Sequence, residues 1–151
     1  MPAASRLPIA VAFWHDTQST DIAVQHVEAM AALARKLNFR MKSVRALPEE
    51  TRARYLAQMG EVSDMIAMRA LVAYHMANQR PMMASFLDAV GIAHDNGVIN
   101  ADNVPPPDAA ALAKAVQAIR ASYPQDAVDL YLRTLVAVDE DTWRGIAPML
   151  G

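Results

Sequence analysis

Residues 64–99 read DMIAMRALVAYHMANQRPMMASFLDAVGIAHDNGVI, and this stretch decides the fold. Between Met65 and Met76, apolar side chains occur on nearly every side of a helical wheel. Such a pattern is typical of a helix that is enclosed by other helices. It predicts a buried central helix over residues 64–79, around which the rest of the chain is expected to pack.

Proline and glycine mark the end of this helix and the segment that follows. Pro81 is unsuited to a helix interior and well suited to a first helical position, so a second helix is expected to begin there. Gly91 stands where a left-handed C-terminal cap favours a residue without a Cβ atom. The dipeptide Asn96-Gly97 favours a tight turn with positive φ at both central residues. We therefore predict a short turn or hairpin near residues 94–99.

Helical spacing recurs on both sides of this stretch. The clearest period lies between residues 20 and 44, where one apolar stripe is expected to face a neighbouring helix. Its members are Ala23, Val27, Met30, Ala34, Leu37, Met41 and Val44. Further helices are expected over residues 48–60, 108–123 and 124–136, and a last short one near Trp143.

Two short stretches, residues 7–14 and 39–45, fit either a helix or a strand, because short apolar runs do not distinguish the two. If both were strands, residues 9–46 would form a βαβ unit. No further alternation of strands and helices follows to complete a parallel sheet. The sequence therefore predicts an all-α, single-domain bundle of six or seven helices over residues 1–151, with residues 100–108 as an extended Pro-rich connector.

Composition narrows the class of protein. A chain of 151 residues with 54% hydrophobic residues is long enough and apolar enough for one globular domain. No apolar run approaches the roughly 20 residues of a membrane-spanning helix, so we expect no membrane partner. The run from Leu7 to Trp14 is too short and too weakly basic at its start for a signal peptide. Together with the absence of cysteine, this predicts a cytoplasmic location.

Charge is balanced overall but unevenly placed. The net charge of −2 gives no reason to expect a nucleic-acid partner, which needs a basic face. Acidic residues Asp139, Glu140 and Asp141 lie near the end of the chain, whereas one internal segment is basic throughout. Its charged residues are Arg35, Lys36, Arg40, Lys42 and Arg45. A solvated face explains such a run, and docking onto an acidic partner, such as a second copy of the chain, is the alternative.

No motif assigns catalytic residues, a metal site or a cofactor. The four histidines lack the paired spacing of a zinc-binding helix. The run after Asp95 does not align with the ligands of a calcium loop, and Gly-rich phosphate loops are missing. A ligand or metal site would have to assemble from Arg69, His75, Asp88, His94 and Asp95 if the hairpin folds back over the central helix. The competing interpretation is structural, with Asp88 as one candidate ion-pair partner for a buried Arg69.

Methionine is abundant, with ten residues in the chain. Flexible thioethers fill irregular cores, but they also line adaptable grooves for a partner helix or an apolar ligand. The methionines near the centre that fit either role are Met59, Met65, Met68, Met76, Met82 and Met83.

The segment from Arg80 to Ile99 resembles a known pattern. The segment reads RPMMASFLDAVGIAHDNGVI, which departs from R-P-M-x-x-F-L-D-x-x-G-I-x-H-x-x-G-x-I in having three residues instead of two between Met82 and Phe86. It is similar to a segment in a group of small bacterial helical proteins of unassigned function. The resemblance covers a minor part of the chain. It implies a helical bacterial protein and supplies no catalytic residues.

Two hypotheses for function follow. The first is a non-enzymatic helical module for protein–protein interaction, self-associating through the 23–44 stripe or through a Met-lined groove. The second is a small-molecule or metal-binding protein, including an enzyme, with its site near Arg69, His75, Asp88, His94 and Asp95. Convergence of at least three of these side chains on one cavity would favour the second.

Overall fold

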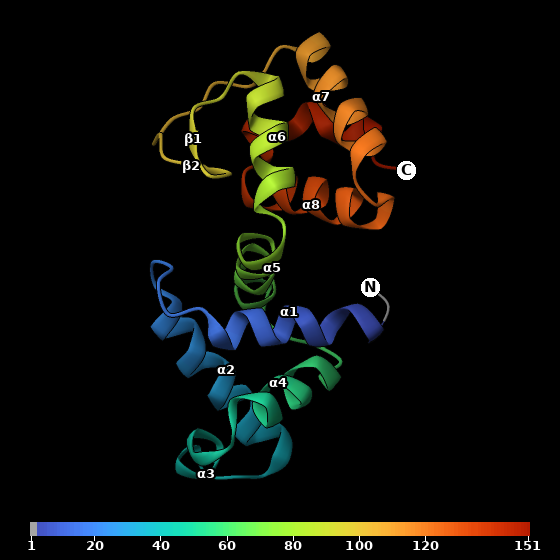
Figure 1. Cartoon of the computed structure of the whole chain (residues 1–151). Coiled ribbons are helices and arrows are strands. Elements are labelled where there is room, and N and C mark those ends of the chain that lie inside the picture. The colour runs from blue at the N-terminus through green and yellow to red at the C-terminus, as the bar shows by residue number, and fades with distance from the viewer. Residues whose placement is uncertain (1–2) are drawn as a thin grey trace. The chain divides into compact units, whose positions relative to one another are not determined.

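The computed structural model describes residues 3–151, with side chains from residue 6 onward, and it is an all-α structure. Helices account for 73% of the chain, so the predicted all-α class is confirmed. The described residues 3–151 form nine α-helices instead of the predicted six or seven, because residues 7–14 are also helical and the predicted helix over residues 20–44 is divided at Asn38. The elements, in order, are α1 (Ala3–His15), α2 (Ile22–Leu37), α3 (Met41–Ala46), α4 (Glu49–Gln58), α5 (Asp64–Asn78), α6 (Arg80–Val90), β1 (His94–Asp95), β2 (Val98–Ile99), α7 (Ala109–Ser122), α8 (Gln125–Val138), α9 (Glu140–Trp143) and the 3-10 helix η1 (Arg144–Met149) (Figure 1).

Contacts between Cα atoms divide the chain into two compact units, residues 1–74 and residues 75–151. We call them unit 1 and unit 2. Helix α5 runs across the division. The predicted single domain over residues 1–151 stays a prediction.

Unit 1 is built on an aromatic cluster at the end of α1. Residues 7–14, which the sequence left open between helix and strand, belong to this helix, and Phe13 and Trp14 are buried. The Nε2–H of His26 on α2 donates to the Phe13 carbonyl at 2.7 Å, and the rings of His26 and Phe13 are 4.9 Å apart. The Arg52 guanidinium of α4 lies 4.8 Å from the centre of the Trp14 ring. These contacts join α1, α2 and α4.

The predicted stripe over residues 23–44 was wrong in two respects. Asn38 takes a left-handed conformation, with φ of 54°, and ends α2, so α3 begins separately at Met41. The buried face of α2 is also rotated, because His26 must face the ring of Phe13, and this turns Val27 outward to 48% exposure. The residues that α2 buries are Ile22, Gln25, Ala29, Met30, Leu33 and Ala34.

Helix α5 is confirmed at the predicted position, and its burial is uneven. Ile66, Ala70 and Ala73 are buried at the spacing of one helical face, whereas Met65 is 60% exposed. Most other positions of the helix are half-buried. The apolar residues on the different sides of this helix are therefore buried to different extents.

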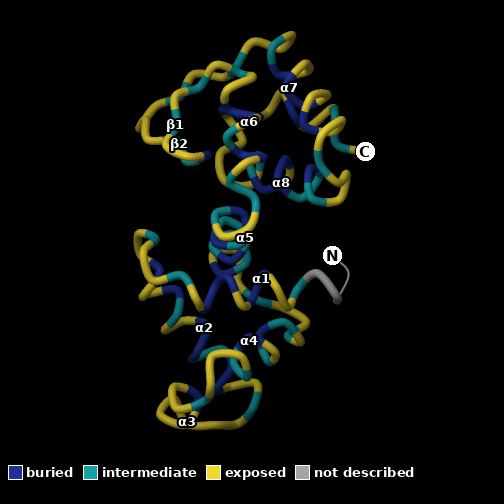
Figure 2. Tube along the Cα trace, viewed as in Figure 1, coloured by how far each residue is buried: buried dark blue, intermediate teal, exposed yellow. Residues whose placement is uncertain are grey.

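Unit 2 has a continuous apolar core. Helix α6 packs along α7, and α8 packs against α9 and η1. Phe86 lies at the centre, with its ring 5.7 Å from the rings of both Tyr131 and Trp143. Figure 2 shows buried segments along the sides of α6, α7 and α8 within this unit. The fully buried large side chains include Met82, Phe86, Leu87, Leu112, Ile119, Val128, Leu132 and Ile146.

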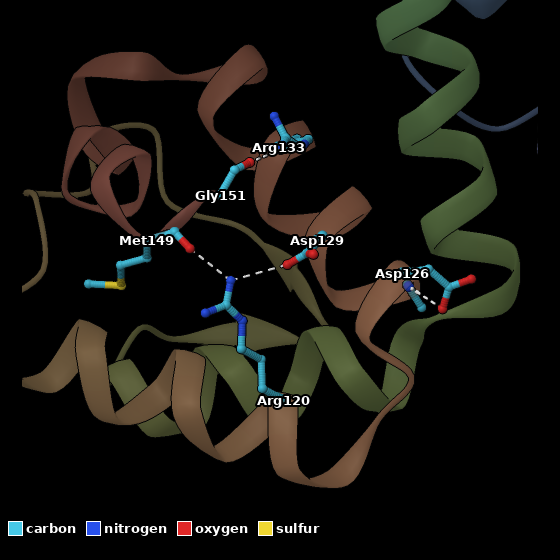
Figure 3. A network of polar contacts seen from close by, with 7 residues as sticks. Arg120, Asp126, Asp129, Arg133, Met149 and Gly151 are labelled. Atoms are coloured by element: carbon cyan, nitrogen blue, oxygen red, sulfur yellow. Dashed lines mark hydrogen bonds and ion pairs between the residues drawn. The ribbon is translucent and has the colours of Figure 1, made fainter. Parts of the chain in front are cut away.

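Arginine side chains tie the last residues of the chain to α7 and α8 (Figure 3). Arg120 Nη2 donates to Asp129 Oδ1 at 3.1 Å and to the Met149 carbonyl at 2.8 Å. Arg133 donates to the Gly151 carbonyl at 2.8 Å. The Thr142 hydroxyl donates to the carbonyl of Val104 at 3.2 Å, which joins the Pro-rich connector to α9.

The predicted hairpin is confirmed at residues 94–99. Strands β1 and β2 pair antiparallel, with His94 opposite Ile99, and Asn96 and Gly97 have φ of 46° and 88°. Gly91 ends α6 with φ of 76°, as its position predicted. The turn lies directly on α6, because Arg80 Nη1 donates to the Asn96 carbonyl at 3.1 Å.

Replacement of Gly97 by alanine is expected to destabilise unit 2 by about 2 kcal/mol or more, since positive φ alone costs an alanine roughly 1–2 kcal/mol. The added Cβ would also lie 2.8 Å from Met83 Cβ and 3.1 Å from the Arg80 carbonyl oxygen, closer than van der Waals contact allows. Urea unfolding followed by circular dichroism measures the change. Gly60→Ala is the matched control, because nothing lies within 4 Å of the added Cβ atom and its effect should stay below about 0.5 kcal/mol. Equal effects for the two variants would contradict this assignment.

Candidate functional site

Asp88 and His94, two of the predicted site residues, contact each other at the base of the hairpin. His94 Nε2 lies 2.9 Å from Asp88 Oδ1, and the Gly97 N–H donates to His94 Nδ1 at 3.0 Å. Because Nδ1 accepts from the Gly97 N–H, Nε2 is the donor to the carboxylate. Nε2 therefore joins the hairpin to the C-terminal half of α6, and Nδ1 closes the turn within the hairpin.

His75 lies in a different setting within unit 2. It is 2% exposed, and its Nε2–H donates to the Thr134 hydroxyl at 3.0 Å, since that hydroxyl itself donates to the Leu130 carbonyl. The ring of Tyr131 is 5.5 Å away in an edge-on arrangement. Burial lowers the pKa of His75 from 6.5 to about 4 and raises the pKa of Tyr131. His75 is thus a neutral side chain that joins α5 to α8 at neutral pH.

The two remaining predicted residues lie elsewhere. Asp95 is exposed on β1 opposite Val98, and Arg69 is half-buried in the part of α5 that belongs to unit 1. Asp88, which the sequence offered to Arg69 as a partner, contacts His94 instead. Across residues 3–151, no three side chains of the metal-ligating types His, Cys, Asp or Glu lie close enough to hold a metal ion. The five-residue site stays a prediction, and only Asp88 and His94 are brought into recorded contact.

A pocket of about 480 Å³ lies within unit 1, and the sequence did not point to it. Its walls come from α1, α4, the segment between α4 and α5, and the first half of α5. Its lining residues are Arg6, Ile9, Ala10, Leu56, Ala57, Met59, Gly60, Glu61, Val62, Ile66, Ala67, Ala70 and Leu71.

Small side chains leave the space that the pocket occupies. Ala57, Gly60, Ala67 and Ala70 are among the lining residues, and an added Cβ atom at Gly60 would meet nothing within 4 Å. The alternation of alanine with leucine or isoleucine in α5 was readable from the sequence. However, it predicts close helix packing as readily as a pocket, because the two differ only in the distance between helices.

The pocket has one cation and one anion in an otherwise apolar wall. Arg6, on α1, is half-buried, whereas Glu61 lies in the segment between α4 and α5 and is exposed. No ion pair or hydrogen bond joins these two described side chains. The remaining walls are aliphatic apart from backbone groups.

The methionines mostly serve the core. Met82 and Met83 are buried in unit 2, and Met65 is exposed. Among the six central methionines only Met59 lines the pocket. The pocket is therefore not lined mainly by methionine.

The basic segment between α2 and α3 is solvent-exposed. All five of its cations are exposed, and no ion pair involves them within residues 6–151. Phe39, between the two helices, is 44% exposed. Figure 2 shows that most of α3, which carries part of this segment, is exposed. A solvated face accounts for this arrangement. The docking of this segment onto an acidic partner stays a prediction.

No family model, curated protein or solved structure matches the chain. Among the described residues no helix is both long enough and apolar enough to cross a membrane. The resemblance of residues 80–99 to small bacterial helical proteins stays an expectation. The candidate site accordingly rests on the geometry of the unit 1 pocket.

The buried His75 should make stability depend on pH. The unfolded chain binds a proton at this ring below pH 6.5 that the folded chain binds only near pH 4, so stability rises with pH between these values and is complete above 6.5. The full contribution is about 3 kcal/mol at 1.36 kcal/mol per pKa unit. His75→Gln keeps a donor for Thr134 and lacks the titration, so its unfolding free energy should vary less between pH 5 and pH 7.5. Urea titrations of both proteins test this, and parallel pH curves would contradict it.

Proposed function

We propose that this chain is a non-enzymatic binding protein and that the pocket in unit 1 binds a small apolar molecule. The observation that supports the proposal is the aliphatic lining of a cavity of about 480 Å³. Ligand pockets in proteins typically measure roughly 300–1,000 Å³ and are lined mainly by apolar side chains with a few polar groups that orient the ligand. The unit 1 pocket fits this description in size and in chemistry.

Burial of apolar surface is the driving force for such binding. Ile9, Leu56 and Ile66 are buried side chains that face the cavity, and Leu71 adds a half-buried one. A ligand that covers these surfaces removes them from water, which stabilises the complex by roughly 25 cal/mol per Å² of apolar area.

The chemistry of the lining favours binding over reaction. Arg6 and Glu61 are the only ionisable residues among the described side chains that line the pocket. Neither His94 nor His75 lines it, and both rings hold structural hydrogen bonds in unit 2. The predicted absence of catalytic residues therefore remains part of this proposal, together with the predicted cytoplasmic location.

Filling the pocket should abolish ligand binding. Ala67→Phe places a ring in the space between α5 and α4, so the affinity for the neutral apolar fluorophore N-phenyl-1-naphthylamine should fall by at least about tenfold. Fluorescence titration measures it. The control is Ala118→Phe, which adds the same ring at an exposed position of α7 in unit 2.

Circular dichroism establishes that both variants are folded. If the unsubstituted chain does not bind the fluorophore, or if Ala67→Phe and Ala118→Phe bind it equally, the pocket is not the binding site. Ala57→Leu provides a second, smaller obstruction from the α4 wall should Ala67→Phe fail to fold.

The second candidate is the helical interaction module, in which two copies associate through α2. The observation in its favour is that Val24 and Val27 are 56% and 48% exposed on neighbouring turns of that helix. Apolar side chains that stay outside the core of one copy are available to another. This proposal keeps Val27 of the predicted 23–44 stripe and adds Val24, which was not one of its members.

Self-association through this face should depend on the valines. Light scattering after size-exclusion chromatography should give the mass of a dimer for the unsubstituted chain and of a monomer for Val24→Glu/Val27→Glu, because facing charges cannot be buried together. Ala118→Glu, on the exposed face of α7, is the control. A monomer at millimolar concentration for the unsubstituted chain would remove this candidate.

A further inference from the structure

We propose that the ligand of the unit 1 pocket is a molecule with an unbranched hydrocarbon chain and a carboxylate head, and that Arg6 binds the carboxylate. The inference rests on the proposed function, because it assigns a chemical class to the ligand of the same pocket. It follows from the position of one half-buried cation in an aliphatic wall.

Arg6 is the polar group best placed to select the ligand. It projects from α1, one turn before Ile9 and Ala10, which line the adjacent wall. Within residues 6–151 no hydrogen bond or ion pair to another side chain is recorded for it. A guanidinium that is partly removed from water gains most from an anionic acceptor, and its planar fork matches the two oxygens of a carboxylate.

Glu61 is the one group that opposes an anion. It is exposed, whereas Arg6 is half-buried, so water screens the charge of Glu61 more strongly. The balance favours an anionic head over a cationic one. Glu61 then lowers the affinity for an anionic ligand without reversing the preference for one. Its removal should strengthen the binding of that ligand.

The rest of the lining suits a hydrocarbon chain. The side chains of Leu56, Ile66 and Leu71 offer branched aliphatic surface and no hydrogen-bonding group, and Ala67 and Ala70 add small apolar ones. A flexible alkyl chain fills such an irregular space without leaving a polar group unpaired. Each added methylene should raise the affinity about fourfold until the pocket is full.

The test compares three probes that share one chain and differ in the head: octanoate, octanol and octylammonium. Each displaces N-phenyl-1-naphthylamine from the full chain at pH 7.5, below its micelle concentration. Octanoate should bind about tenfold more tightly than octanol, as expected for a charged hydrogen-bonded pair, and octylammonium more weakly than either. Hexanoate and decanoate supply the dependence on chain length.

Two substitutions assign the selectivity to the named side chains. Arg6→Gln should bring octanoate down to the affinity of octanol while octanol itself changes little. Glu61→Gln should raise octanoate affinity severalfold. The matched control is Arg54→Gln, which removes an exposed cation of α4 that does not line the pocket.

The outcomes separate this inference from the proposed function. If the fluorophore and octanol bind at the pocket but octanoate binds no better than octanol, the carboxylate inference is overturned and the pocket remains a binding site. A preference for octylammonium overturns it as well. If Arg6→Gln does not fold, the octanoate-to-octanol ratio of the unsubstituted chain and the effect of Glu61→Gln still decide the question. If no probe binds, the proposed function itself falls.

Discussion

The close contact between the hairpin backbone and α6 is the constraint on which unit 2 depends. A glycine at position 97 lets the turn approach Met83 and the Arg80 carbonyl at distances that a side chain would prevent. The approach brings the Asn96 carbonyl to Arg80 and His94 to Asp88. These two polar contacts join the hairpin to α6 at the start and near the end of that helix. Within residues 80–99, Arg80, Asp88, His94 and Gly97 all contact or form the hairpin, whereas Gly91 ends α6.

Local chemistry made this part of the fold predictable from the sequence. Gly91 and Asn96-Gly97 need backbone conformations that few residues adopt, and their neighbours in the chain are also their neighbours in space. The face that α2 buries was harder to predict from the sequence, because two overlapping apolar stripes fit the same helix. The choice between them was made by a contact from α1 to His26, which lies outside the helix's own pattern.

The candidate site could be predicted from the sequence even less than the fold. The sequence singled out ionisable residues, and the structure uses three of them, His75, Asp88 and His94, for internal hydrogen bonds. The pocket depends instead on alanine and glycine, whose significance lies in the volume that they leave empty. Such a volume exists only once the distances between α1, α4 and α5 are fixed. Those distances are long-range properties, and no periodicity along one segment encodes them.

The continuity of α5 has a consequence for any dissection of the molecule. The division between the two units falls after Tyr74, inside a helix that ends at Asn78. A cut at that position would leave a fragment of four helical residues, 75–78, too short to nucleate on its own. It would also place His75 at a free amino terminus beside its Thr134 partner. Fragments that begin at Asp64 would retain the whole of α5. However, unit 1 would then lose the wall of its pocket that α5 provides.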